Sequence, residues 1–248
     1  MNRSRILSRI RNIPNRLGPR SRGVYPDRET TPVSLPAMRR QGYDDARIAP
    51  VAFDLMCQVA PFDYPVLYWL QALAKPGMSI LDAGGHLGTK YLAFRNYVQL
   101  ADMTWTVFDL PQIISVAREW QRQGRLPEEI RFEHDVVALP RCELMIASGL
   151  LQYLDRPFAG FLADLPKKPR HILLNKVAVR DGPTIVTLEK IGRSRVPYQI
   201  RNQPKFEAEI RGAGYRIRDT WPIPSLAHQI RWHPRAGTSA SLGYLLEV

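Results

Sequence analysis

A glycine-rich loop directly follows a short apolar run, and it contains residue types that can surround a nucleotide. The apolar run covers 78–81, and Asp82, Gly84, Gly85 and Gly88 come after it. Glycine lets the backbone turn tightly and approach a ligand closely. In open α/β sheets, ligands bind beyond the carboxyl ends of the strands, where this loop is expected. A glycine turn that binds no ligand is the alternative.

A carboxylate stands at the end of the next apolar run along the chain. Asp109 follows 105–108, which has the composition of a strand. At the end of the second strand of such a fold, a carboxylate can accept hydrogen bonds from both ribose hydroxyls. Pro111 and Gln112 follow, so capping of the next helix is an alternative role for Asp109, and the two roles are compatible.

The loop favours S-adenosylmethionine over a dinucleotide. Its glycines fit the dinucleotide pattern G-x-G-x-x-G only if Ala83 replaces the first glycine. Asp82 also disfavours a ligand rich in phosphate and suits a cationic group. S-adenosylmethionine carries an ammonium, a carboxylate and a sulfonium but no phosphate.

Several stretches resemble the Rossmann-like (class I) S-adenosylmethionine-dependent methyltransferases. The loop 80–89 and Tyr91 look most like a family of predicted methyltransferases encoded near bacterial surface-polysaccharide genes, which has a doubled glycine here and a tyrosine after it. The resemblance spans about residues 40–220, and its most specific part is 148–154. Further matches are 42–44, 105–107, Pro197-Tyr198 and Gly214-Tyr215. His86 departs from the pattern, since these loops more often have a small residue there.

The resemblance implies cofactor roles for individual residues. Asp82 and Gly84 would lie near the methionine end, Asp109 at the ribose, and Ser148 and Gly149 beneath the reacting methyl group. Asp135 would face the adenine amino group, with a solvated turn as its alternative role. The full expected cofactor site is Asp82, Gly84, Gly85, His86, Gly88, Tyr91, Asp109, Leu110, Asp135, Ser148 and Gly149.

Methyl transfer from a sulfonium is an in-line displacement, so positioning can supply much of the acceleration. A general base is needed only if the acceptor must lose a proton, as a sugar hydroxyl must. Tyr153, His228 and His233 are the catalytic candidates, and His171 and Glu189 are weaker ones. Packing of Tyr153 and simple exposure of the loop histidines are the alternatives. Cys57 and Cys142 suit reduced core thiols, and no metal ligand is assigned.

These residues require a sheet that brings the ends of several strands together. The pattern predicts an α/β fold: a Rossmann-like, mostly parallel seven-stranded sheet with helices on both faces and a C-terminal antiparallel hairpin. The expected strands are 78–81, 104–108, 130–132, 144–147, 171–177, 215–217 and 241–246, and the expected helices are 87–100, 113–123 and 157–165. Two further helices are expected between 44 and 74, separated at Pro61. The segment 181–201 is predicted to be irregular, either a basic lid over an acidic or phosphorylated acceptor or a solvated loop.

The charge is concentrated at the N-terminal end. Of the formal net charge of +12, residues 1–22 contribute +7 through seven arginines without an acid, which leaves +5. The apolar residues of 6–13 fall on one helical face, which suits contact with an anionic membrane surface; a solvated extension is the alternative. We expect an extension and linker over 1–40, irregular from 15 to 37, and a methyltransferase domain over 41–248. No transmembrane or signal segment is apparent, so we expect a cytoplasmic protein, with attachment to the inner membrane through the tail as an option.

The expected function is therefore methyl transfer from S-adenosylmethionine to a small-molecule or glycan acceptor, in surface-polysaccharide biosynthesis according to the resemblance. Two alternatives remain open. An RNA methyltransferase fits the high pI, but most of the excess charge lies in a short tail and no aromatic–basic stripe accompanies it, so a nucleic-acid partner is not expected. A non-catalytic methyltransferase-like scaffold is the other alternative, because a fold does not prove a function.

Overall fold

Five parallel strands form the centre of the fold in the computed structural model, which describes residues 21–31, 46, 49–50, 52–191, 194–229, 233 and 236–248. These strands lie side by side in the order β6-β5-β2-β3-β4. Their bounds are β2 Ser79–Ala83, β3 Thr104–Phe108, β4 Ile130–Glu133, β5 Leu144–Ser148 and β6 His171–Arg180. The five strands expected from the apolar runs between 78 and 177 are thus confirmed.

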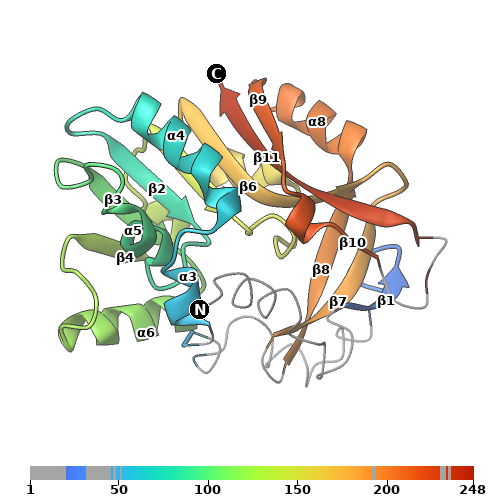
Figure 1. Ribbon diagram of the computed structural model, residues 1–248, viewed down its shortest axis with the longest axis horizontal. Helices are drawn as coiled ribbons and strands as arrows, with labels where there is room; N and C mark the ends of the chain where they lie inside the picture. Colours follow the sequence, from blue (N-terminus) through green and yellow to red (C-terminus); the bar gives the residue numbers. More distant parts are fainter. Residues whose placement is uncertain are drawn as a thin grey trace, which may run out of the picture.

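The C-terminal strands pair against the outer edge of β6. The strand β11 (Thr238–Glu247) runs antiparallel to β6 on one side and to β9 (Arg216–Pro222) on the other. A short strand β10 (His228–Gln229) also pairs with β11. The predicted antiparallel hairpin is therefore present, and it extends the central sheet (Figure 1).

Three further strands continue beyond the carboxyl end of β6. In β8 (Ser194–Asn202), Arg201 and Asn202 pair in parallel with the last residues of β6. The strand β7 (Ile185–Ile191) pairs antiparallel with β8, and β1 (Ser21–Tyr25) pairs with β7. Figure 1 shows β1, β7 and β8 projecting together from the side of the molecule opposite β3 and β4.

These strands correct the predicted sheet. The described residues contain eleven strands rather than seven, and β1, β7, β8 and β10 are the additional ones. The segment expected to be irregular, 181–201, is largely the β7–β8 hairpin, because Val186 and Leu188 are buried and its backbone groups pair across the strands. The expected irregular linker likewise contains β1, which takes up the free edge of β7.

Helices cover both faces of the central sheet. One face carries α3 (Phe53–Met56), the 3₁₀ helix η2 (Pro61–Asp63), α4 (Tyr64–Leu73), α5 (Thr89–Phe94) and α6 (Pro111–Arg122). The other carries α7 (Phe158–Asp164) and α8 (Gln203–Gly212). Two short 3₁₀ helices, η3 (Val136–Ala138) and η4 (Pro224–Leu226), lie in loops.

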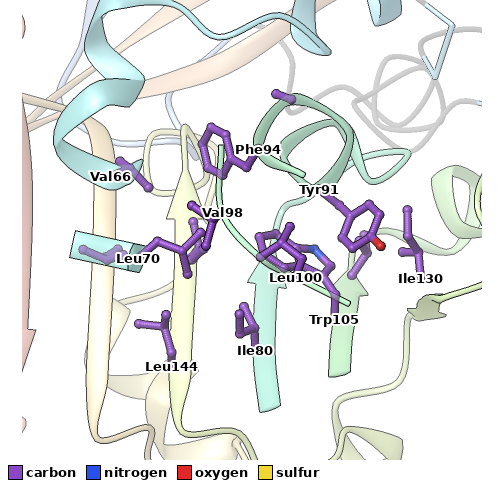
Figure 2. Packing of buried hydrophobic residues seen from close by; sticks show 14 of the residues in the cluster. Val66, Leu70, Ile80, Tyr91, Phe94, Val98, Leu100, Trp105, Ile130 and Leu144 are labelled. Carbon is purple, nitrogen blue, oxygen red and sulfur yellow. The ribbon is translucent and has the colours of Figure 1, made fainter. Parts of the chain in front are cut away.

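Alternation along the strands divides the core into two layers. In β5, Leu144 and Ile146 pack against the first group of helices, whereas Met145 and Ala147 pack against α7 and α8. Figure 2 shows the first layer, in which Leu70 and Phe94 from the helices meet Ile80 and Leu144 from the strands.

Some expected helix bounds are wrong. The helix expected over 87–100 ends at Phe94, after which the chain forms turns. Of the helix expected before Pro61, the described residues contain Phe53–Met56, and part of its expected range lies outside the described residues. The helix α8 is absent from the expected elements, although Asn202 caps it and Phe206 and Ile210 supply its buried face. In the described ranges, no helix has both the length and the apolar character needed to cross a bilayer.

Candidate functional site

The residues singled out in the sequence gather where the order of the strands reverses. From β2 the chain continues to β3 and β4 on one side, and then crosses back to β5 and β6 on the other. The connections after β2 and β5, at the carboxyl edge of the sheet, therefore run toward opposite sides of this reversal point, which is the usual ligand site of an open α/β sheet.

The glycine loop after β2 uses left-handed backbone conformations at alternate positions. Gly84, His86 and Gly88 have φ angles of 71°, 58° and 76°. Glycine adopts such angles without steric cost, whereas histidine is only tolerated there. The Gly84 amide donates to the carbonyl of Phe108 at 2.8 Å, which holds the loop against the end of β3. His86 is buried, so its ring faces the interior.

Asp82 lies beneath this loop rather than on its surface. Its residue is 1% exposed, and Trp105 Nε1 donates to its Oδ2 at 3.3 Å. A side chain at Gly85 would place Cβ 2.5 Å from Asp82 Cγ, so the close approach requires glycine. Burial raises the Asp82 pKa to about 7, against the opposing effect of Lys90. The carboxyl group is therefore poised to respond to a nearby cation.

Asp109 connects the end of β3 to the glycine loop. Its Oδ2 accepts from the His86 amide at 2.8 Å, and its Oδ1 accepts from the Leu110 amide at 2.7 Å. The N-cap of α6 is Leu110, and no side chain caps that helix, so the alternative capping role of Asp109 is not observed. A carboxylate has about four acceptor positions, so it can bind several donors at once.

The loop after β5 lies next to the glycine loop. A Cβ at Gly84 would lie 3.0 Å from Leu150 Cδ1, so the two loops are in contact. The Gly149 amide donates to the carbonyl of Asn175 at 2.9 Å. Ser148 Oγ is buried and has no hydrogen-bond partner within the described residues, which leaves a polar atom available at this edge.

A bulge in β6 brings Asn175 and Lys176 to the same edge. Between Leu174 and Val177 the strand has one residue more than the facing part of β11, and Lys176 has a φ of 60°. A hypothetical Cβ at Gly149 would lie 3.3 Å from Lys176 Nζ. Bulges and left-handed non-glycine residues concentrate near functional sites, so Lys176 is a candidate that the sequence does not indicate.

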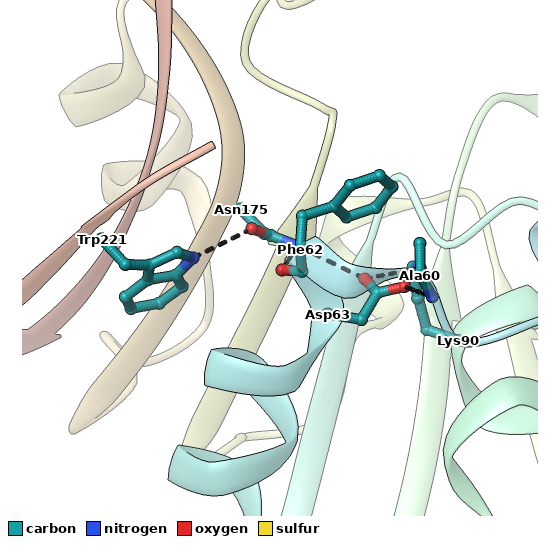
Figure 3. A network of polar contacts seen from close by, with 6 residues as sticks. All are labelled: Ala60, Phe62, Asp63, Lys90, Asn175 and Trp221. Carbon is teal, nitrogen blue, oxygen red and sulfur yellow. Dashed lines mark hydrogen bonds and ion pairs between the residues drawn. The ribbon is translucent and has the colours of Figure 1, made fainter. Parts of the chain in front are cut away.

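A buried polar network includes Asn175, at the bulge of β6, and Lys90, on the helix that follows the glycine loop (Figure 3). Lys90 Nζ lies 2.8 Å from both carboxylate oxygens of Asp63. Asn175 Nδ2 donates to the Phe62 carbonyl at 3.2 Å, and Asn175 Oδ1 accepts from Trp221 Nε1 at 3.3 Å. The network therefore joins η2, α5, β6 and β9.

The sequence does not single out this network. In the sequence, each of the three polar residues Asp63, Lys90 and Asn175 has apolar residues near it. A polar residue among apolar sequence neighbours is the one signal that could have indicated them. Which of them meet depends on tertiary contacts between residues 63, 90 and 175, and no spacing in the sequence indicates those.

The remaining cofactor candidates differ in position. Tyr91 is buried, with its ring centroid 5.7 Å from that of Trp105. Leu110 is 39% exposed next to Asp109. Asp135 is exposed and caps η3 by accepting from the Val137 amide at 3.0 Å, which corresponds to its alternative role in a solvated turn.

Among the catalytic candidates, Tyr153 has the most defined surroundings. Its Oη donates to Glu189 Oε2 on β7, and its ring packs edge-on against Tyr198 on β8, 5.6 Å between centroids. His233 is exposed, and the side chain of His228 lies outside the described part of the structure. His171 begins β6 at the opposite end of the sheet, buried against Glu247, so it is neither on the surface nor at this site.

No protein-family model and no curated protein sequence matches this chain. Similar solved structures include 1,6-didemethyltoxoflavin-N1-methyltransferase from Burkholderia thailandensis, solved with S-adenosylhomocysteine, at 21% identity over 75% of this chain and 78% of that one (TM-score 0.50). Two others have TM-scores of 0.51: the glycopeptide N-methyltransferase MtfA with S-adenosylmethionine (12% identity, 76% and 94% covered) and an S-adenosylmethionine-dependent methyltransferase from Methanosarcina mazei (10%, 77% and 98%). At these identities the likeness shows the fold: a mixed α/β fold that is shared with S-adenosylmethionine-dependent methyltransferases.

Proposed function

We propose that this chain is a methyltransferase that uses S-adenosylmethionine and acts on a small-molecule or glycan acceptor. The observation that carries the proposal is Asp109, which joins the end of β3 to the glycine loop through the His86 amide at the reversal point of the strand order. The solved structures of similar fold that contain S-adenosylmethionine or S-adenosylhomocysteine support the same cofactor.

The donor and acceptor groups at this edge of the sheet fit this cofactor. Asp109, beside the glycine loop, is the proposed acceptor for the ribose hydroxyls, and Ser148 Oγ offers a buried polar atom with no partner in the described residues. Asp82, whose pKa is raised by burial, suits a cationic amino group. Asp135 is assigned to the adenine amino group, and Gly84, Gly85, Gly88, Gly149, His86, Tyr91 and Leu110 to the walls of the pocket.

The cofactor supplies an electrophilic methyl group on a positively charged sulfur. This chain positions the acceptor against that methyl group, which accounts for much of the rate enhancement in displacement reactions. Tyr153 is the proposed proton acceptor, because its phenol already donates to Glu189. A proton leaving the acceptor hydroxyl passes to Tyr153 Oη while the phenolic proton moves to Glu189 Oε2. His228 and His233 are retained as alternative bases.

The acceptor class and the biological setting are also proposals. The similar structures include enzymes for a small heterocycle and for a glycopeptide, which favours an organic acceptor of modest size. Assignment to surface-polysaccharide biosynthesis rests on the sequence resemblance. The division at residue 40 and attachment to a membrane through residues 1–22 are proposed on the arginine content and apolar spacing of the N-terminal segment. The cytoplasmic location is proposed on Cys57 and Cys142, which suit reduced thiols.

Calorimetric titration with S-adenosylmethionine, and separately with NADH, tests the cofactor. We expect micromolar binding of S-adenosylmethionine and no heat with NADH. The variant Asp109→Ala should bind S-adenosylmethionine about tenfold more weakly or worse, because hydrogen bonds to a charged group contribute about 1.5–3 kcal/mol. Asp102→Ala, an exposed acid before the amino end of β3, is the matched control and should bind like the wild type.

Each part of the proposal can fail separately in this experiment. Unchanged affinity in a folded Asp109→Ala variant would refute the ribose assignment. Absence of binding to the wild-type chain would favour the non-catalytic scaffold.

A further inference from the structure

A cavity of about 270 Å³ lies apart from the glycine loop, between the start of α8, the end of β8 and the segment 154–157. None of the residues from Asp82 to Gly88, nor Asp109, lines it. Its volume is just below the range of about 300–1,000 Å³ that is usual for small-molecule sites. The cavity is lined by four cationic side chains, Arg28, Arg156, Arg201 and Lys205, and two acidic ones, Asp155 and Glu209.

Arg201 is the central side chain of this cavity. It is 6% exposed, and its Nη1 has no hydrogen-bond partner among the residues that the structure describes. Burial lowers the Arg201 pKa to about 10, the nearby Arg28 acts in the same direction, and Glu209 opposes both. A buried guanidinium nitrogen without an acceptor is costly and therefore rare in native structures.

Arg28, from a different part of the chain, also has a buried guanidinium nitrogen without a hydrogen-bond partner in the described residues. It follows β1 in sequence, and its Nη2 donates to the carbonyl of Gln152 at 3.3 Å. The nitrogen without a partner in the described ranges is its Nε. Two guanidinium groups, one on β8 and one beyond β1, thus line one cavity, and each has one buried nitrogen without an acceptor among the described residues.

The acidic side chains at the cavity do not satisfy these donors. Glu209 Oε1 accepts from the Ala159 amide at 2.9 Å, and Asp155 reaches Arg28 only as a nearby charge. Arg156 differs from the other cations, since it pairs with Asp164 outside the cavity. The positive end of the α8 dipole adds to the potential, although Asn202 already accepts from the Lys205 amide and Pro204 has no N–H.

We propose that this cavity is a binding site for a phosphate group. A phosphate offers three acceptor oxygens, so it can meet Arg201 and Arg28 together and leave an oxygen for Lys205. A carboxylate offers only two acceptor oxygens. The site is separate from the proposed cofactor site, and it does not depend on methyl transfer.

The test is a calorimetric titration of the full chain, without S-adenosylmethionine, against sodium phosphate, glycerol 3-phosphate and sodium acetate at matched ionic strength. The first two probes distinguish free phosphate from a phosphate ester. We expect both to bind and acetate not to bind. Arg201→Gln and Arg28→Gln should each weaken phosphate binding at least about tenfold, the loss of one hydrogen bond to a charged group.

Arg211→Gln is the matched control, because Arg211 lies on the same helix α8, is largely exposed and pairs with Glu207. Phosphate should raise the unfolding temperature of the wild type and of Arg211→Gln, but not that of Arg201→Gln. Should Arg201→Gln fold poorly, Arg28→Gln decides the question, since Arg28 is only partly buried. No binding of phosphate to the wild type, equal loss in the control, or equally tight acetate would overturn the proposal.

Discussion

Asp82 should make the stability of the protein depend on pH near neutrality. Its pKa is about 7 in the folded protein and near 3.8 in an unfolded chain, so the folded state holds the proton between these values. The favourable contribution is complete below about pH 4 and is lost as the pH rises through 7. We therefore expect the wild type to lose stability relative to Asp82→Asn between about pH 4 and 7, with little further change above that range.

Thermal unfolding of the two proteins over this pH range measures the effect. The asparagine can still accept from Trp105, so the two proteins differ mainly in the titratable proton. Asp102→Asn, at an exposed position, should follow the wild type at every pH. A constant difference between wild type and Asp82→Asn would contradict the expectation.

Lys176 should reveal the cost of a left-handed residue in a strand. At its φ of 60° a glycine is unstrained, whereas an alanine pays about 1–2 kcal/mol. Both variants lose the lysine side chain, so Lys176→Gly should be more stable than Lys176→Ala by about 1 kcal/mol in urea unfolding. At Lys190 in β7, where φ is not positive, the order should reverse.

The role of a single residue can be predicted where its type suits a ligand and its position follows a predicted strand. Glycines after one apolar run and an acid after the next are typical of a nucleotide site, so the sequence indicates both the glycine loop and Asp109, and the structure brings them to one edge of the sheet. The left-handed backbone of His86 and the bulge at Lys176 are not predictable. They depend on pairing with neighbouring strands, and the residue types at those positions do not indicate it.

At the level of elements, the Asp63–Lys90 pair attaches η2 to α5, the helix that follows the glycine loop. Both side chains are buried, and Asn175 adds a contact to Asp63 Oδ1 at 3.4 Å. Removal of one partner from a buried pair leaves an uncompensated charge and costs about 3–5 kcal/mol. Lys90→Met should therefore lower the free energy of unfolding by that amount in urea titrations.

The double variant Asp63→Asn/Lys90→Met separates pairing from packing. It removes both charges, so it should be more stable than Lys90→Met alone. If the double variant were the less stable of the two, the charge of Asp63 would not be the cause of the loss.

Elements with a simple periodicity are predicted well from the sequence, and those with mixed composition are not. The strands β2, β5 and β6 are mostly apolar runs buried on both faces, as central parallel strands require, whereas the edge strand β4 alternates buried Ile130 and Phe132 with exposed Arg131. The β7–β8 hairpin contains Pro197 and several arginines, and this composition favours a loop. Its two strands pair mainly with each other, and pairing with β1 and with the end of β6 adds support from outside its own sequence.

The whole molecule divides into regions of unequal packing, which hydrogen exchange should detect. Two large buried clusters enclose the central strands, whereas the cluster at β7 and β8 has three buried members, Ala178, Ile185 and Ile200. Regions with few buried contacts open at lower free energy. We expect amides of β7 and β8 to exchange faster than those of β2 and β5 in mass-spectrometric measurements, and slower exchange there would contradict this view.

Fold class is predictable because alternating strands and helices leave few architectures open. The number of strands is not, since the structure adds β1 through a pairing with β7 that is distant in sequence, and β7, β8 and β10 through local pairings in segments of mixed composition. The candidate site is predictable in the part formed by consecutive β–α units. The part contributed by η2, β6 and β9 depends on contacts between residues that are distant in sequence.

The pairing of β6 with β11 has a consequence for the time course of folding. The two strands are far apart in sequence, with Glu247 opposite His171, and such distant pairings form slowly because a long loop must close first. Until β11 arrives, an edge of this strongly apolar strand remains open to other chains. Newly made protein should therefore pass through an aggregation-prone interval, and its yield should fall with concentration and temperature during refolding.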